Sequence, residues 1–224
     1  MLSHLVQKIK KEEFIFDKNI PKIRLAQIVV SKAICLFNAL ITLRKFAFVN
    51  PSAVLLSKEM IYNSGNFLIG KRCTIDALSI DGLKLGYNVS IHDNTSIECS
   101  GSLKHLGKGI ILGNNVGIGR NSHLGGAGGI TIGDDTILGQ YVSIHSENHN
   151  AGVQGEKIRL SGVSRKGVVI GSNCWIGAKA TILDGVILGD NCIVAAGAVL
   201  LSGVYKGNSV YGGIPAKQIG ITYK

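Results

Sequence analysis

The sequence predicts an all-β solenoid of hexapeptide repeats, and three observations favour that fold class. An aliphatic residue returns at every sixth position over long stretches after residue 66, and glycine often follows it, with Asn or Asp close behind, as in LGNNVG and LGDNCI. The chain also has 30 glycines but only 3 prolines. Glycine spread through a Val-, Ile- and Leu-rich chain indicates many tight turns between short strands. The aliphatic residues with this spacing are Leu85, Ile91, Ile97, Leu112, Ile118, Leu124, Ile132, Leu138, Ile144, Ile170, Ile176, Ile182, Leu188, Val194 and Leu200.

A six-residue spacing excludes a helix face, which needs apolar residues three and four positions apart. It fits a short strand, a tight turn and another short strand, with Asn, Asp and Gly accepting the positive φ of the turns. Three units then form one triangular coil of eighteen residues, as from Ile170 to Leu188. Stacked coils place the aliphatic residues in ladders inside the prism. Cys174 and Cys192 are also eighteen residues apart, so we expect them in one ladder rather than at a metal.

Residues 1–65 differ from the rest and are predicted to form an N-terminal helical segment, with the β-helix over residues 66–224. No glycine or proline interrupts residues 22–48, and Pro21 suits the first turn of a helix there. Lys32 lies in the middle of the apolar run and disfavours a membrane-spanning helix. Two interpretations stay open. The helix packs on its own protein or on a neighbouring subunit, or it rests with a basic face on anionic lipid.

The charge, aromatic and cysteine content of the chain excludes some classes of function and favours one cell compartment. Residues 1–50 hold nine basic and three acidic residues, which supplies six of the net +10 charges of the chain. Aromatic residues make up only 6% and do not alternate with basic ones, so no nucleic-acid role is expected. The five cysteines form no C-x-x-C pair, which favours a reducing compartment. We therefore expect a cytoplasmic protein, either free or peripheral on the inner face of the cytoplasmic membrane through residues 1–50.

The repeat breaks at two places, and breaks in a solenoid map to loops that carry function. One break follows Ile97, and a longer one follows Ile144, where about residues 150–169 form an inserted loop. His145 and His149 lie directly before the second break. A neutral imidazole there is suited to act as a general base.

The segments IGDDTILG, IGSNCWIGAKATIL, ILGDNCIVAAGAV and GGIPAKQIG resemble the hexapeptide-repeat acyltransferases over about residues 66–220. The resemblance implies a left-handed parallel β-helix, which is an exception to the right-handed crossover rule. It also implies a homotrimer with active sites between subunits and acetyl-CoA as the acyl donor, with no metal.

The stretch from Ser146 to His149 resembles the S/T-x-x-H segment of the maltose and galactoside acetyltransferases and of polysaccharide O-acetyltransferases. The resemblance implies that His149 is the catalytic base, with Asn148 and Ser146 as its neighbours. His145 is a second candidate that orients His149, contacts the sugar or has no role.

The resemblance also implies an acyl-donor groove. Trp175 follows the tryptophan of the family's N-x-W-I-G unit, although a ladder aromatic is an equally good interpretation. The small residues Gly177, Ala178, Ala196 and Gly197 match positions where the backbone is left accessible to coenzyme A. Relatives carry Thr-Lys shortly afterwards, whereas this chain has Ser202 in that region, so Lys206 or Lys217 takes the place of that lysine.

The function that these features favour is transfer of an acetyl group from acetyl-CoA to a sugar hydroxyl, in surface polysaccharide (O-antigen or capsule) biosynthesis. One alternative is N-acetylation of a nucleotide-linked amino sugar, in which the basic residues of the inserted loop at about residues 150–169 would bind the diphosphate. A second is a zinc hydratase like the γ-class carbonic anhydrases, using His123, His145 and His149. A third is a structural trimer without activity.

Overall fold

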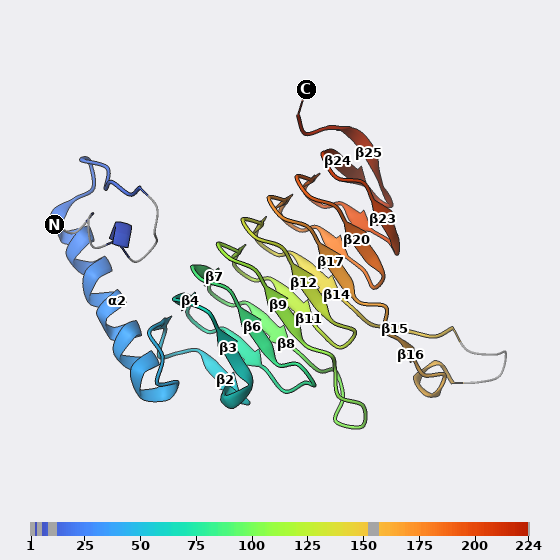
Figure 1. Ribbon diagram of the computed structural model, residues 1–224, viewed down its shortest axis with the longest axis horizontal. Coiled ribbons are helices and arrows are strands. Elements are labelled where there is room, and N and C mark those ends of the chain that lie inside the picture. Colours follow the sequence, from blue (N-terminus) through green and yellow to red (C-terminus); the bar gives the residue numbers. More distant parts are fainter. Residues whose placement is uncertain (1–2, 4–5, 9–12, 152–156, 224) are drawn as a thin grey trace.

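The computed structural model describes residues 3, 6–8, 13–151 and 157–223 and shows a triangular prism of stacked coils preceded by one long helix (Figure 1). Each coil contributes one strand to each of three sheets, called sheets A, B and C. The chain passes from A to B to C and then begins the next coil. Neighbouring strands are parallel, except for the last pair of sheet A. The predicted left-handed parallel β-helix is confirmed.

Sheet A holds, in order, β1 (Phe48–Val49), β4 (Phe67–Ile69), β7 (Val89–Ile91), β10 (Gly117–Ile118), β13 (Ile137–Leu138), β18 (Trp175–Ile176), β21 (Ile193–Val194), β24 (Ser209–Gly213) and β25 (Ala216–Ile221). Sheet B holds β2 (Val54–Leu56), β5 (Thr74–Asp76), β8 (Ser96–Glu98), β11 (His123–Gly125), β14 (Ser143–His145), β19 (Thr181–Ile182) and β22 (Val199–Leu200). Sheet C holds β23 (Gly203–Tyr205), β20 (Val186–Leu188), β17 (Val168–Ile170), β12 (Ile130–Ile132), β9 (Ile110–Leu112), β6 (Leu83–Leu85) and β3 (Ile61–Asn63).

The predicted aliphatic ladders form the core. Ile170 pairs with Leu188, and Ile176 pairs with Val194, in the same register on neighbouring coils. All of the aliphatic residues named for the six-residue spacing are buried. Cys174 and Cys192 are buried in one ladder, with the Cys192 N–H 3.4 Å from Cys174 Sγ, as predicted.

The coil corners depend on left-handed turns and on very close backbone contact. Asn115, Asp135, Asn173 and Asn191 all have a φ between +53° and +59°, and their side chains hydrogen-bond from coil to coil. Asn115 Nδ2 donates to Asp135 at 2.7 Å, and Asn173 Nδ2 donates to Asn191 at 2.8 Å. A Cβ at Gly177 would lie 2.6 Å from the backbone nitrogen of Ala196, so only glycine allows that corner to stack.

The prism begins earlier than the predicted boundary at residue 66. Strands β1, β2 and β3 pair with β4, β5 and β6 and belong to the same three sheets. Val49, Leu55 and Ile61 are buried there and continue the six-residue spacing backwards from Phe67. Glycine does not follow them, which is why the repeat is not evident in this part of the sequence.

Helix α2 (Lys22–Thr42) follows Pro21, as predicted, but ends before Phe48. Leu43 caps it, Arg44 takes a left-handed φ of +55°, and Phe48 already begins strand β1. Only Cys35 and Ala39 of the helix are buried. With 21 residues and a mean hydropathy of 1.8, α2 has the length and composition to cross a membrane. Two short 3-10 turns lie at Lys58–Met60 and Ile158–Leu160.

Candidate functional site

Two histidines lie side by side on the outer face of sheet B. His123 is on β11 and His145 is on β14, and the centres of their rings are 5.4 Å apart. Both side chains are half-buried. The hydroxyl of Ser143, two residues before His145 on the same strand face, is 2.7 Å from His145 Nε2. The alternation of a strand turns these three side chains outward, while Leu124 and Ile144 point into the core.

The environment keeps His145 neutral. Burial, and to a smaller extent the charge of His123, lowers the pKa of His145 from its ordinary value of 6.5. A neutral imidazole has one N–H donor and one ring nitrogen acceptor. His145 can therefore both donate and accept hydrogen bonds near neutral pH.

The chain leaves the prism directly after His145. Strands β15 (Asn148–His149) and β16 (Val163–Ser164) form an antiparallel pair that we call the arm, and β17 resumes the coil (Figure 1). The insertion predicted at about residues 150–169 is thus present, although it begins slightly earlier, and residues 152–156 lie outside the described part. His149 and Asn148 are both exposed at the start of the arm. His145 instead remains on the face of sheet B, beside His123.

Ser146 does not face His149, contrary to the prediction. Its side chain is buried, donates to the carbonyl oxygen of Gly125 at 2.7 Å and accepts the N–H of Gly128 at 2.9 Å. Ser146 therefore ties the corner between sheets B and C to the preceding coil.

Both breaks of the repeat occur at this B/C corner, and a salt bridge joins them. Residues 99–109 form the first loop, between β8 and β9. Arg165, next to β16, donates to Glu147 with an Nε–Oε2 distance of 2.5 Å and to the carbonyl oxygens of His105 and Leu106 at 3.2 and 3.3 Å. Arg165 was predicted as part of a basic loop, but its guanidinium holds the two insertions together.

Asp184 anchors the return of the arm into the coil. Its carboxylate is buried and accepts the backbone N–H groups of Lys166 and Gly167 at 2.8 and 2.7 Å, as well as the Ser164 hydroxyl at 3.4 Å. A buried carboxylate is tolerated where hydrogen bonds satisfy it in this way.

The residues predicted for the acyl-donor groove lie at two different corners and on the last strand. Trp175, 53% exposed on sheet A, leads into the A/B corner. Gly177 and Ala178 are at that corner, and Ala196 and Gly197 are at the same corner one coil later. The two coils are joined there, because the Gly197 N–H donates to the Ala178 carbonyl oxygen at 2.9 Å. Ser202 is exposed at the B/C corner, and Lys217 is exposed on β25. Gly177 itself is covered by the next coil, so the need for glycine at this position comes from coil stacking rather than from an open backbone.

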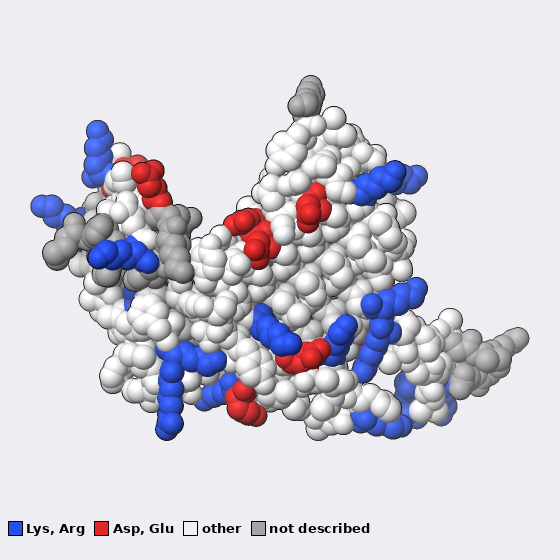
Figure 2. All heavy atoms as spheres, in the orientation of Figure 1, with Lys and Arg blue, Asp and Glu red and all other residues white. Residues whose placement is uncertain are grey.

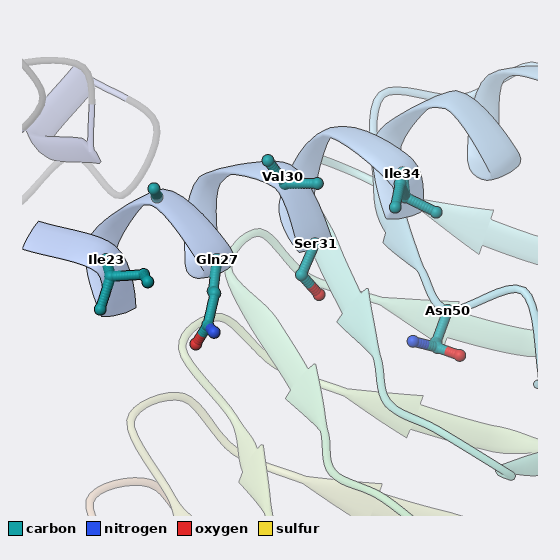
Figure 3. Close-up of a pocket in the computed structure, with 7 residues that line it drawn as sticks. Ile23, Gln27, Val30, Ser31, Ile34 and Asn50 are labelled. Atoms are coloured by element: carbon teal, nitrogen blue, oxygen red, sulfur yellow. The ribbon is translucent and has the colours of Figure 1, made fainter.

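One hollow lies away from the histidines. It has a volume of about 440 Å³ and lies between α2 and the first coils (Figure 3). Its lining is mainly apolar, with Ile23, Val30 and Ile34 from the helix and Asn50 from the segment after β1. Within the described residues, no group of three or more His, Cys, Asp or Glu side chains is placed to hold a metal ion.

Ser143 and Asp184 were not predicted from the sequence as residues of the site, and His123 was predicted only as an alternative zinc ligand. The sequence does contain a signal for Ser143, because His123 and Ser143 both come directly before an inward aliphatic residue. Residues at that place in the repeat share one sheet face. No comparable signal marks Asp184, since its partners are backbone groups of the arm.

Comparison with known proteins supports the fold. Residues 167–202 match the family model described as bacterial transferase hexapeptide (six repeats). No curated protein sequence matches the chain significantly. A mutant of AntD, an N-acyltransferase from Bacillus cereus solved with dTDP and coenzyme A, has a TM-score of 0.58 at 17% identity, covering 80% of this chain and 83% of its own. A maltose O-acetyltransferase from Clostridium difficile 630 has a TM-score of 0.50 at 20% identity, covering 88% and 89%.

We predict that Asp184→Ala lowers the free energy of unfolding by about 1–3 kcal/mol, because two buried backbone N–H groups lose their acceptor. Urea unfolding measures this change, and limited proteolysis should show faster cleavage within the arm. The control is Asp81→Ala, since the Asp81 carboxylate lies on the surface, 3.9 Å from Lys84, where an ion pair contributes little. An unchanged midpoint in Asp184→Ala would contradict the anchoring role.

Proposed function

We propose that this chain, a hexapeptide-repeat protein with the left-handed β-helix fold, is an acetyl-CoA-dependent O-acetyltransferase that acts on a sugar hydroxyl in the synthesis of a surface polysaccharide such as O-antigen or capsule. The observation that carries the proposal is the position of the histidines, at the corner where the prism opens into the arm. The likeness to a maltose O-acetyltransferase supports the same class of acceptor.

In this proposal His149 is the catalytic base. Its side chain is exposed at the root of the arm, where an acceptor can reach it, and it occupies the histidine position of the S-x-x-H stretch. The imidazole takes the proton of the sugar hydroxyl while the hydroxyl oxygen attacks the thioester carbonyl. The carbon–sulfur bond then breaks, and the proton passes from His149 to the departing thiolate of coenzyme A. Asn148, the residue before it, is the proposed neighbour that orients the acceptor or the imidazole.

The acyl donor is proposed to lie along the A/B corner, against Trp175, Gly177, Ala178, Ala196 and Gly197. Ser202, at the B/C corner, and Lys217, on β25, are proposed to contact the donor that is held at the A/B corner of a neighbouring copy. The exposed Trp175 and the stacked small residues support this assignment. In one chain this corner is separated from His149 by the width of sheet B.

That separation supports a homotrimer, in which a second copy brings its A/B corner next to the B/C corner of the first. Sheet C is proposed to take part in the interface, because its outward residues Ile111, Val169, Ile187 and Val204 are apolar and 41–76% exposed. Figure 2 shows a broad band without charged side chains over β17 and β20. Burying these side chains between copies removes apolar surface from water.

Residues 1–50 are proposed to contact an anionic membrane surface on the cytoplasmic side. One side of α2 is apolar along its whole length, with Ile23, Val30, Ile34, Phe37 and Ile41 each 51–72% exposed. These residues recur at helical spacings of three, four and seven, so they lie on one side of the helix. Lys22 and Arg44 lie at its two ends, where they can pair with lipid headgroups.

N-acylation of a nucleotide-linked amino sugar is the second candidate, and the likeness to AntD favours it. A diphosphate would need free basic groups. Arg165 is bound to Glu147, which leaves Lys157, Arg159 and Lys166 as the exposed basic residues of the described arm. Offering sugar hydroxyl and nucleotide amino-sugar acceptors in one acetyl-CoA assay separates the two candidates.

We predict that His149→Ala lowers kcat/KM for acetyl transfer by about 100- to 10,000-fold, the usual contribution of a general base, while coenzyme A binding is retained. Release of free thiol from acetyl-CoA in the presence of a panel of sugars and lipid-linked glycans measures this. His105→Ala, an exposed histidine on the neighbouring loop, is the matched control and should retain activity. Full activity in His149→Ala would rule this histidine out as the base.

We predict that Ile187→Glu separates the trimer into single chains, because three buried carboxylates without partners would oppose association. Light scattering coupled to size-exclusion chromatography gives the mass. Leu103→Glu places the same charge on a side chain that is 82% exposed in the first loop and should leave the mass unchanged. A wild-type protein that elutes as a single chain would refute the interface.

We predict that the wild-type protein floats with phosphatidylcholine vesicles that contain phosphatidylglycerol and that Phe37→Glu abolishes this binding. The substitution places a charge in the middle of the apolar side of α2. Ile80→Glu, at a prism position that is 71% exposed, serves as the control and should bind like the wild type. Failure of the wild type to float would favour a protein partner for α2 instead.

A further inference from the structure

The outer face of sheet B carries rows of polar side chains, whereas the outward residues of β9, β17, β20 and β23 on sheet C are apolar. Ser96, His123, Ser143 and Thr181 follow one another in register across β8, β11, β14 and β19. Glu98, Gly125 and His145 form a parallel second row. A face with hydroxyl, imidazole and carboxylate groups in regular rows can make many hydrogen bonds to one flat ligand.

Gly125 makes room for the histidine pair. It lies in the second row between Glu98 and His145, and a Cβ there would be 3.3 Å from His123 Nε2. This is tighter than an ordinary contact, so a larger side chain would displace the imidazole of His123. Glycine thus leaves room for the His123 ring in the second row, beside His145.

The hydrogen-bonding groups of this row match a polyhydroxylated ligand. His145 is held neutral by burial, so its ring offers a donor and an acceptor, with the Ser143 hydroxyl alongside. Glu98 is exposed and its carboxylate accepts hydrogen bonds. Asp76, next to Glu98 on β5, adds a second carboxylate. Asp76 Oδ1 accepts hydrogen bonds from the Ser57 hydroxyl and the Leu78 N–H, so its charge rather than a direct contact bears on the ligand. Two carboxylates in the row disfavour a phosphate group, whereas a sugar hydroxyl can donate to Glu98.

Both insertions leave the prism beside this row, at the B/C corner. The first loop begins directly after Glu98, and the arm begins directly after His145. The salt bridge from Arg165 to Glu147 joins them. A ligand on the row would therefore lie next to the root of the arm, where His149 is.

We propose that Glu98, His123, Ser143 and His145 form a saccharide-binding site that positions the acceptor on the face of sheet B. This inference rests on the proposed function, because it supplies the acceptor on which His149 would act. Glu98 and the histidine pair hold hydroxyl groups of one sugar ring, and Ser143 holds the ring of His145 in place through its contact with Nε2. His123 and His145 are then positioning residues, distinct from the base.

Saturation-transfer NMR without coenzyme A tests the site directly. The probe is a panel of methyl glycosides of common hexoses, measured with the wild type, Glu98→Gln, His145→Ala and Gly125→Leu. We expect at least one glycoside to bind, and each variant to weaken its binding by about tenfold or more, equivalent to one lost charge-assisted hydrogen bond. Thr74→Leu adds the same side chain as Gly125→Leu on the same face, two strands away from His123 and outside the four proposed residues, and binding should stay within about twofold.

The outcomes separate this site from the proposed activity. Loss of glycoside binding in His145→Ala and Glu98→Gln, with binding retained in His149→Ala, supports the site even if no acetyl transfer is found. With an active acceptor, His145→Ala should raise KM for the sugar far more than it lowers kcat. Absence of binding to every glycoside, or equal binding in all folded variants, overturns the proposal. Tight Zn²⁺ binding that the same variants abolish would also overturn it.

Discussion

The rest of the structure depends on the backbone contact between successive coils. Each strand hydrogen-bonds to the equivalent strand one coil away, and at corners such as Gly177 the two backbones approach until no Cβ fits between them. This contact fixes which residues point inward and which outward on all three sheets. The polar row of sheet B and the apolar face of sheet C are therefore consequences of register rather than of separate local folds.

The same constraint explains where extra residues can be inserted. A coil must resume in register with the previous one, so an insertion has to leave and return at a corner. Both long insertions do this at the B/C corner, and buried side chains secure the junctions. Ser146 ties the departing chain to Gly125 and Gly128, and Asp184 holds the returning backbone at Lys166 and Gly167. Both loops therefore border the same edge of sheet B.

Much of the fold could be predicted from the sequence, because the aliphatic residue of each six-residue unit marks the position whose side chain points into the core. The ladders, the Asn and Asp turns, the start of α2 and both insertions follow from such local signals. The coils before residue 66 were missed because Val49, Leu55 and Ile61 keep the spacing without the glycine that marks a turn. The pairing of His123 with His145 and the bond of Arg165 to Glu147 join residues far apart in the chain, so only coil register and side-chain direction reveal them.

The anchoring of the arm at a single corner has a consequence for how this scaffold can change. Because the stacked coils carry the core, and none of the arm residues that the structure describes (148–151 and 157–166) is buried, this part of the arm contributes little to overall stability. An arm of different length or composition, kept between the same buried serine and aspartate, would leave the prism intact. The fold therefore separates the part that must stay constant from the part that can be exchanged, and a different surface can arise beside sheet B without refolding the protein.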